Sequence, residues 1–198
     1  HLDDLFENFF IRFLRGSGLK GLISLSKSTQ YKENSINILR PLLDFEKKDL
    51  TYLSKKVFNF YIEDPSNKNK DFKRIRVRML LNELQKEGLD KNKLLLTLNN
   101  LKDSDQSIKF YVDKNIIQNS KFLKKKNTFI LNSNFFEQSH EVIFRSLSQL
   151  IKTISKKYYA ARGKSVNELI SKIKSNSIKK TTLGGCFIEK INKTVLIY

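Results

Sequence analysis

The chain has 198 residues, of which 39% are hydrophobic, and this is enough for one larger domain or two smaller ones with a buried core. Its 38 lysines and arginines outnumber its 20 aspartates and glutamates, and the net charge of +18 favours a polyanionic partner such as nucleic acid, although a lysine-rich composition across a whole proteome would produce a similar excess. The single cysteine, Cys186, excludes an internal disulfide and a Cys-x-x-Cys metal or redox site, and it is typical of a reducing cytoplasm. No apolar run approaches the ~20 residues that span a bilayer.

The first seventy residues combine helical and strand-like patterns with turn signals. In chain order they predict a helix over 3–14, a short helix over 19–26, a polar loop over 27–35, a strand over 36–39, a helix over 46–57, a short strand or extended segment over 58–62 and a turn over 64–67. Gly16 and Gly18 are expected to end the first helix. Pro41 is expected to end the strand or to hold it at an edge, and Asp44 to cap the third helix. Residues 1–70 are therefore predicted to be a partial α/β layer with an exposed apolar flank.

From residue 71 onward helical periodicity dominates. The predicted segments are helices over 72–86, 90–119, 140–156 and 164–174, a basic link over 121–126, short strands over 129–131 and 135–136, and a hairpin over 182–198 that turns at residues 192–193. The predicted fold class is α+β and mostly helical. It divides into the partial α/β layer over 1–70, a helical domain over 71–160 and a small helix-plus-hairpin region over 161–198.

The chain opens on a cluster of carboxylates at the start of its first helix. Asp3 and Glu7 share one face of that helix, and Asp4 lies beside them. Acids at this place stabilise a helix through its dipole, which is a purely structural explanation. They also suit Mg²⁺, because hard cations prefer carboxylate oxygens and like charges this close need a counter-ion. The residues alone leave both interpretations open.

Two further motifs contain residue types that bind phosphate. The run Arg15-Gly16-Ser17-Gly18 is typical of a helix C-terminus, but two glycines around a serine also allow a nest of backbone N–H groups for an anion. Arg74, Arg76 and Arg78 are three of only eight arginines in the chain. On a helix they spread over about 200° of the surface, as a solvated face would. Arginine is nevertheless favoured where phosphate is held by two hydrogen bonds, and this favours a functional role.

The motifs are more specific together than singly. In chain order they are His1-x-Asp3-Asp4-x-x-Glu7, Arg15-Gly16-Ser17-Gly18, Arg40-Pro41-Leu42-Leu43, Asp64-Pro65-Ser66-Asn67 and Phe72-x-Arg74-x-Arg76-x-Arg78. With this combination the chain resembles the bacterial tRNA(Ile)-lysidine synthases of the PP-loop ATP pyrophosphatase superfamily, densely over 1–88 and thinly over 90–180. The Ser-Gly-Gly-x-Asp-Ser loop of that family is not among these residues, and the chain begins at a histidine. We therefore expect an internal fragment that lacks the N-terminal PP-loop and is inactive alone.

The resemblance implies a cytoplasmic ligase that uses ATP and Mg²⁺. Family members adenylate C2 of the wobble cytidine in the CAU anticodon of tRNA(Ile), and free L-lysine then displaces AMP to give lysidine. Residues 1–70 would be the C-terminal part of a Rossmann-like PP-loop domain, and 71–160 a tRNA-binding or linker domain. By resemblance, catalysis is assigned to Asp3, Asp4 and Glu7, with Asp3 and Asp4 as Mg²⁺ ligands. Nucleotide binding is assigned to His1, Arg15, Gly16, Ser17, Gly18 and Arg40. Contacts with the tRNA are assigned to Asp64, Asn67, Arg74, Arg76 and Arg78.

Two other functions are compatible with parts of the sequence. A non-catalytic RNA-binding module would explain the positive charge but not the ordered acidic and glycine motifs. A tRNA-thiolation enzyme of the same superfamily is a nearer alternative, but several of those enzymes use a pair of cysteines, which Cys186 alone cannot supply. No membrane contact is expected, and both a monomer and a homodimer stay open.

Overall fold

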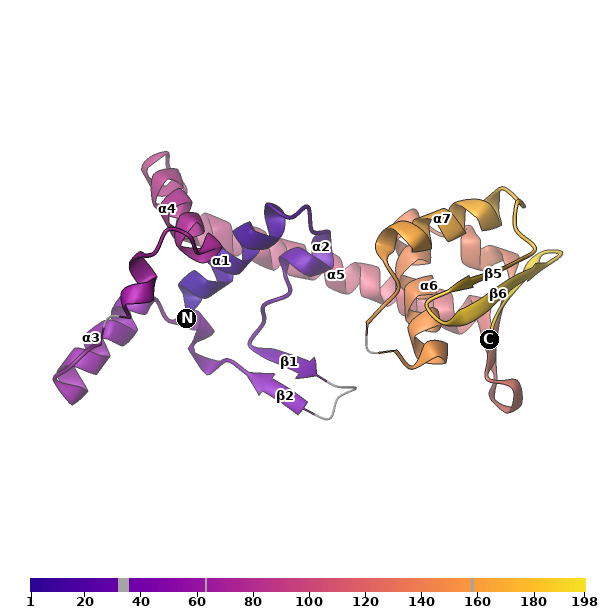
Figure 1. Ribbon diagram of the computed structural model, residues 1–198, viewed down its shortest axis with the longest axis horizontal. Coiled ribbons are helices and arrows are strands. Elements are labelled where there is room, and N and C mark those ends of the chain that lie inside the picture. The colour runs from indigo at the N-terminus through magenta and orange to yellow at the C-terminus, as the bar shows by residue number, and fades with distance from the viewer. Residues whose placement is uncertain (32–35, 63, 158) are drawn as a thin grey trace. The chain divides into compact units, whose positions relative to one another are not determined.

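The computed structural model describes residues 1–31, 36–62, 64–157 and 159–198 (Figure 1). They form two compact units, His1–Asp105 and Gln106–Tyr198, and the long helix α5 (Lys91–Asn119) contributes its first half to one unit and its second half to the other. Helices dominate over small antiparallel sheets, so the predicted α+β, mostly helical class is confirmed. The functional boundaries predicted after residues 70 and 160 stay predictions. Among the described helices, none combines the length and apolar character needed to cross a bilayer.

The unit His1–Asp105 is built mainly from helices. Its elements, with 3-10 helices marked η, are α1 (Leu2–Phe13), α2 (Leu19–Leu22), β1 (Ser28–Tyr31), β2 (Ile36–Leu39), η1 (Pro41–Asp44), α3 (Lys47–Phe58), η2 (Pro65–Lys68), α4 (Lys73–Lys86) and the first half of α5. Strands β1 and β2 pair antiparallel. The core of this unit is formed by α1, α4 and α5, through Leu5, Phe6, Val77, Leu81, Leu94 and Leu98. Packing against α4 and α5 therefore holds the acidic start of α1 in place.

Helix α1 is stabilised locally at both ends. At its start, the Asp4 carboxylate accepts a hydrogen bond of 3.1 Å from the backbone nitrogen of His1, and the acids of the first turn suit the positive end of the helix dipole. At its end, Gly16 has a φ of +69°, a left-handed conformation that glycine adopts without a steric penalty. The apolar side of α1 is only partly covered, since Phe13 keeps 59% of its surface exposed. The helix thus presents acids at one end and uncovered apolar surface at the other.

The unit Gln106–Tyr198 is a five-stranded sheet with helices. Its elements are the second half of α5, β3 (Ser120–Leu123), η3 (Lys124–Lys126), β4 (Thr128–Leu131), η4 (Ser133–Phe136), α6 (His140–Ser155), α7 (Gly163–Lys174), β5 (Lys180–Leu183), β6 (Cys186–Ile191) and β7 (Thr194–Ile197). The strand order is β3-β4-β7-β6-β5, and every neighbouring pair is antiparallel. Apolar residues of α6 and α7 form one core with alternate residues of the central strands, including Ile188 and Ile197.

Two early segments differ from their predictions. The loop predicted over 27–35 is wrong for Ser28–Tyr31, which pairs with β2 as a strand; residues 32–35 lie outside the described part of the chain. Its Ser-Thr-Gln-Tyr sequence has little hydrophobic alternation, so the pairing partner decides its conformation. The short helix predicted over 19–26 is a single turn, Leu19–Leu22.

The ends of α3 also differ from the prediction. Asp44 is not its N-cap: it ends η1, and Glu46 is the N-cap residue. Of the short strand or extended segment predicted over 58–62, no strand is formed: Phe58 is the last residue of α3, Asn59 ends the helix in a left-handed conformation with a φ of 58°, and residues 60–62 belong to no helix or strand. Asparagine tolerates this conformation, which terminates helices, better than most residues do.

The second unit contains more strand than predicted. The basic segment over 121–126 is not a link, because its first half belongs to β3 and its second half is η3. The strand predicted over 135–136 is a 3-10 helix, whose start is held by the side chain of Asn132 accepting from the backbone N–H of Phe135. The first arm of the predicted hairpin is two strands, because Gly184 and Gly185, both with positive φ, turn the chain between β5 and β6.

Candidate active site

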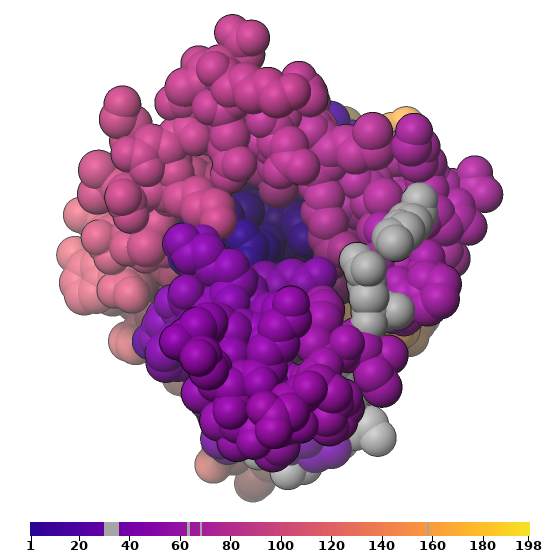
Figure 2. All heavy atoms as spheres, turned by 90° about the vertical axis from the view of Figure 1, so that its left-hand side faces the viewer, coloured from indigo at the N-terminus to yellow at the C-terminus, as the bar shows by residue number. Residues whose placement is uncertain are grey.

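The start of α1 borders a pocket of about 220 Å³ in the first unit. In the space-filling view, N-terminal residues lie at the bottom of a hollow whose rim is formed by later segments of the same unit (Figure 2). The lining of the pocket combines acidic and basic side chains with the apolar residues Phe6, Leu81, Leu89 and Leu94. Its charged residues are Asp3, Glu7, Lys47, Arg78 and Lys91. Such a lining can bind a small ligand that itself carries charges of both signs.

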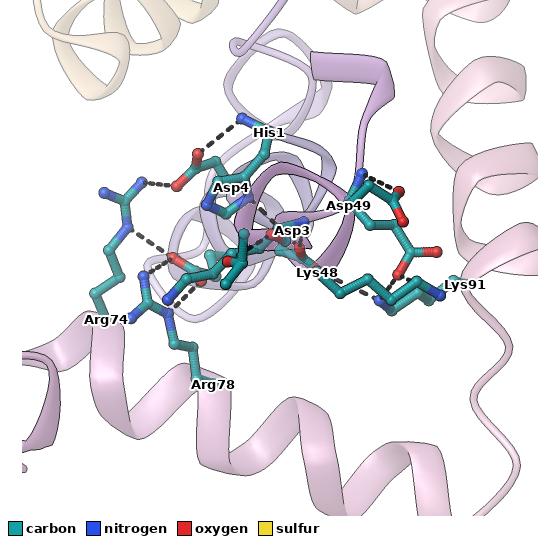
Figure 3. Close-up of polar contacts among 12 residues, drawn as sticks. His1, Asp3, Asp4, Lys48, Asp49, Arg74, Arg78 and Lys91 are labelled. Atoms are coloured by element: carbon teal, nitrogen blue, oxygen red, sulfur yellow. Dashed lines mark hydrogen bonds and ion pairs between the residues drawn. The ribbon is translucent and has the colours of Figure 1, made fainter. Parts of the chain in front are cut away.

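Glu7 is the buried acid of this site. Its side chain is only 2% exposed, and its carboxylate binds two arginines of α4, with Arg74 Nε 2.8 Å from Oε2 and Arg78 Nε 2.5 Å from Oε1. The two arginines are four residues apart, so they leave the same face of α4 and reach toward α1 (Figure 3). Burying an unpaired carboxylate is costly, and this double ion pair is what makes the position of Glu7 tolerable.

Asp4 shares Arg74 with Glu7 but is more open to solvent. Arg74 Nη2 lies 3.3 Å from Asp4 Oδ1, and the side chain of Asp4 is 27% exposed (Figure 3). Arg74 is itself 51% exposed, so solvent screens this ion pair and another partner can replace it at small cost. Asp4 is therefore more available to an incoming cationic group than Glu7 is.

Asp3 connects three elements of the first unit. Its Oδ1 accepts from Lys91 Nζ at 3.1 Å, and its Oδ2 accepts from the backbone N–H of Lys47 at 2.9 Å. Lys91 also donates to Glu46, the N-cap of α3, at 2.9 Å. Burial favours a raised pKa for Asp3, but the hydrogen bonds from Lys47 and Lys91 outweigh it and hold the pKa below its usual value. Burial acts against the charge of Lys91 as well, yet its two carboxylate partners raise its pKa.

The turn after α3 joins the same network. Asp64 accepts from the backbone N–H of Ser66 at 2.9 Å, and this hydrogen bond lowers the pKa of Asp64 and closes the predicted turn. Asn67 Oδ1 then accepts from Arg78 Nη1 at 3.1 Å. The amide of Asn67 and the carboxylate of Glu7 thus hold the guanidinium of Arg78 from two sides.

The three arginines of α4 have different environments. Arg74 and Arg78 bind carboxylates of α1. Arg76 lies on another face of the helix and is exposed, and it donates to the backbone carbonyls of Lys70 and Asp71 at 3.0 and 2.6 Å. The spread predicted for these side chains around the helix is therefore observed, and it divides them between two kinds of partner.

Arg15–Gly18 and Arg40 make hydrogen bonds of their own, away from these acids. Arg15–Gly18 follows the far end of α1, and two of its backbone N–H groups donate to the carbonyl of Arg12, as in a helix C-terminus. The guanidinium of Arg40 donates to the carbonyl of Ser26 at 3.1 Å and to the hydroxyl of Thr29 at 2.9 Å. His1, in contrast, borders the pocket with its Nδ1 3.5 Å from a carboxylate oxygen of Asp3.

The chain is similar to known proteins over its whole length. Residues 1–84 match the family described as the PP-loop domain. The whole chain is similar to proteins named tRNA(Ile)-lysidine synthase, with 30% identity to the one from Wolbachia sp. subsp. Brugia malayi, 30% to the one from Orientia tsutsugamushi and 33% to the one from Rickettsia felis. Residues 1–84 thus match a PP-loop domain, and the chain as a whole is similar to the tRNA(Ile)-lysidine synthases. It spans about half the length of these relatives, 46%, 46% and 45% respectively.

Three residues of this site were not predicted from the sequence. Lys91, Lys47 and Glu46 contact Asp3 or each other, although 43 to 88 residues separate them from it along the chain. The pattern Glu46-x-x-Asp49, in which each side chain caps the other's backbone, is the signal that could have placed Glu46 at the start of α3 in place of Asp44. No sequence signal distinguished Lys91 from the many other lysines of the chain.

The acids of this site do not fit a Mg²⁺ ion with their present partners. The two oxygens of Asp3 accept from Lys91 and Lys47, and those of Asp4 face Arg74 and the backbone nitrogen of His1. Within the described ranges, no group of three or more His, Cys, Asp or Glu side chains converges on one point. A metal ion at Asp3 or Asp4 would have to take the place of one of these hydrogen-bond or ion-pair partners, and no step below is assigned to a metal.

The Lys91 ion pairs lead to an expectation about pH. Replacing Lys91 with methionine should lower the free energy of unfolding at pH 7 by at most about 1 kcal/mol, because the pair is partly exposed. Asp3 has a lowered pKa, so its contribution is present above its usual value of 3.8 and is lost as the pH falls through the lower folded-state pKa. Lys91 has a raised pKa, so its contribution is complete below 10.5 and is lost only as the pH rises through the folded-state pKa.

Urea titrations of both proteins at pH 7 and near pH 2 test this expectation. The difference between the wild type and Lys91→Met should shrink at the acid pH. Lys93→Met, at an exposed position of the same helix, is the matched control and should differ little from the wild type at either pH. A Lys91→Met difference that is equal at both pH values would contradict the assignment of this stability to the Asp3 pair.

Proposed function

We propose that the protein containing this chain is an ATP-dependent ligase that joins free L-lysine to C2 of the wobble cytidine of tRNA(Ile) with a CAU anticodon, forming lysidine in the cytoplasm. The observation that carries the proposal is the similarity along the whole chain to relatives named tRNA(Ile)-lysidine synthase. The pocket of mixed charge at the start of α1 supports it, because free lysine carries a carboxylate and two ammonium groups.

In the proposed reaction, ATP transfers AMP to the oxygen on C2 of the cytidine, and pyrophosphate leaves. The side-chain amine of lysine then attacks C2. A C–N bond forms, the C–O bond to AMP breaks, and the amine gives up a proton. Holding the amine against the activated carbon removes much of the entropic barrier, so positioning groups contribute as much as the proton acceptor does.

Asp4 is proposed as the carboxylate that orients the lysine amine and accepts its proton. It is 27% exposed, and its contact with Arg74 at 3.3 Å is longer than the shortest contact that Glu7 makes with each of its two arginines. An incoming ammonium can therefore exchange with Arg74 at Asp4 more easily than at Glu7. Glu7 is proposed to act through the two arginines that it holds, and Asp3 by keeping the start of α1 against α3 and α5.

The nucleotide-binding part of the proposal has two different supports. The PP-loop domain match over residues 1–84 supports the use of ATP. His1 is assigned to the nucleotide because it borders the pocket. Arg15–Gly18 and Arg40 are assigned to it by the resemblance of their motifs alone, since their present hydrogen bonds are internal.

The tRNA is proposed to contact the second unit most extensively. Gln106–Tyr198 carries 18 lysines and arginines against five acids, whereas His1–Asp105 carries 20 against 15. Phosphate contacts follow positive charge, and the excess of positive charge is larger in the second unit than in the first.

In the first unit, Arg76 is the proposed RNA contact of α4, because Arg74 and Arg78 face carboxylates. Asp64 and Asn67 are proposed to shape this edge of the site through the turn and through Arg78.

Removing lysines from η3 should weaken tRNA binding and its salt dependence. The variant Lys124→Gln, Lys125→Gln, Lys126→Gln is expected to reduce the slope of log affinity against log salt by up to about one for each lost phosphate contact. The matched control Lys55→Gln, Lys56→Gln, Lys86→Gln loses the same charge from the first unit. Filter binding of tRNA between 50 and 200 mM salt (roughly the range over which such contacts change affinity most) gives both slopes. Equal slopes for the two variants would contradict a tRNA contact at η3.

Incorporation of labelled lysine tests the ligase proposal. The intact protein, given ATP and a CAU-anticodon tRNA, should transfer lysine to the tRNA and release AMP, and should not do so with a tRNA of another anticodon. Tight tRNA binding without incorporation would favour a non-catalytic RNA-binding protein. Transfer of sulfur instead of lysine would favour the thiolation enzymes.

A further inference from the structure

One face of the five-stranded sheet in the second unit is covered by helices, and the register of the strands defines the other. Residues that pair across neighbouring strands point to the same side. Ile188 pairs with Ile197, and both are buried in the core with α6 and α7. The alternate positions therefore form the outer face. One row of that face runs across all five strands, through Lys121, Ile130, Leu196, Glu189 and Lys180.

Aromatic rings occupy this outer face next to the row. Phe187 exchanges backbone hydrogen bonds with Tyr198, so their side chains lie on one side of the sheet, and the two rings stack with centroids 5.7 Å apart and an interplanar angle of 27°. Phe187 is 48% exposed, although it belongs to strand β6. A large ring that stays open to solvent beside a second ring is a surface on which a further flat group can stack.

Positive charge surrounds these rings. The ammonium of Lys180 lies 5.1 Å from the centroid of Phe187 and 5.3 Å from that of Tyr198. The one acid of the row, Glu189, pairs across the strands with Lys180 and accepts a hydrogen bond of 2.9 Å from the Tyr198 hydroxyl. The carboxylate of Glu189 is thus engaged by Tyr198 beside Lys180. The whole unit carries 18 basic and five acidic residues, so the ligand that suits the face is an anion with flat groups.

We propose that the outer face around Phe187, Tyr198 and Lys180 binds unpaired RNA nucleotides by stacking bases on the exposed rings and by contacts of lysine with the phosphates. Single-stranded nucleic acid is bound in general by this combination of aromatic faces and positive charge. Double-stranded RNA is a poor ligand for such a face, because its bases are stacked on each other. The inference rests on the proposed function only in taking RNA as the class of ligand.

Tryptophan offers a direct test, because the chain contains none. Phe187→Trp places a single fluorescent ring at the proposed surface, and Phe58→Trp places one at an exposed position of the first unit that is 65% exposed. Both variants of the full chain are titrated with an unstructured oligouridylate and with an RNA duplex of equal length. The expected result is strong quenching of Phe187→Trp by the single strand, weak quenching by the duplex and little change in Phe58→Trp.

Affinities separate stacking from charge. Phe187→Ala should weaken oligouridylate binding about tenfold and leave its salt dependence unchanged, since the loss of one stacked base removes no phosphate contact. Lys180→Gln should lower the salt slope by roughly 0.7. Phe58→Ala is the control for truncating an exposed ring. The inference is overturned if the fluorescence of Phe187→Trp is not quenched by the single strand, or if Phe187→Ala and Phe58→Ala bind oligouridylate with equal affinity. It is also overturned if Phe187→Ala changes self-association in sedimentation but leaves RNA binding unchanged. Because no ATP, lysine or tRNA is present, these outcomes do not depend on whether the ligase proposal holds.

Discussion

Replacing Asp4 with asparagine is expected to slow lysidine formation by about 10²–10⁴-fold while changing tRNA affinity little. Asparagine keeps the shape of the side chain but removes the negative charge that would hold the lysine amine and take up its proton. The position is open enough for a ligand, since Asp4 is 27% exposed and its arginine partner is 51% exposed. Measurement requires single-turnover transfer of lysine by the intact protein, together with filter binding of the tRNA.

The matched control for this variant is Glu83→Gln. Glu83 lies on α4, forms a surface pair with Lys86 and is 66% exposed, so its substitution removes the same charge without touching the acids of α1. Its rate should stay close to that of the wild type. If Asp4→Asn turned over normally, or if it lost tRNA binding in step with rate, the acids at the start of α1 would be explained by the helix dipole alone.

Replacing Arg78 with methionine is expected to lower the free energy of unfolding of the first unit by about 2 kcal/mol. Arg78 is one of two cations on Glu7, whose side chain is 2% exposed, and it also donates to Asn67. Methionine preserves much of the apolar volume but leaves the buried carboxylate with Arg74 alone among the contacts described. Urea titration followed by far-ultraviolet circular dichroism gives the loss.

Lys86→Met is the control for Arg78→Met. Lys86 is on the same helix and 70% exposed, so removing its surface ion pair should cost less than about 0.5 kcal/mol. The double variant Glu7→Gln, Arg78→Met should be less destabilised than the sum of the two single changes, because a neutral amide no longer needs the cation. Additive losses would mean that Glu7 and Arg78 stabilise the unit independently of each other.

Helices were predicted better than strands, for a physical reason. The spacing of apolar residues specified α1, α4, α6 and α7 almost to their ends, because each helix carries its own hydrogen bonds and needs only one apolar side. Strands β1 and β3 were missed. Their sequences, Ser-Thr-Gln-Tyr and Ser-Lys-Phe-Leu, are mostly polar or basic, and a strand is completed only by a partner elsewhere in the chain.

The order of the motifs, the caps of the helices and the surplus of positive charge are properties of the sequence itself. They were sufficient to indicate the acids of α1 as a candidate site and a resemblance to the tRNA(Ile)-lysidine synthases, and residues 1–84 match a PP-loop domain. The partners of those acids were decided by the tertiary structure. Arg74 and Arg78, expected at RNA, bind Glu7, and Lys91 binds Asp3 across 88 residues of chain. Electrostatic interactions depend on distance in space, and only the packing of α1 against α4 and α5 brings these charges within reach of one another.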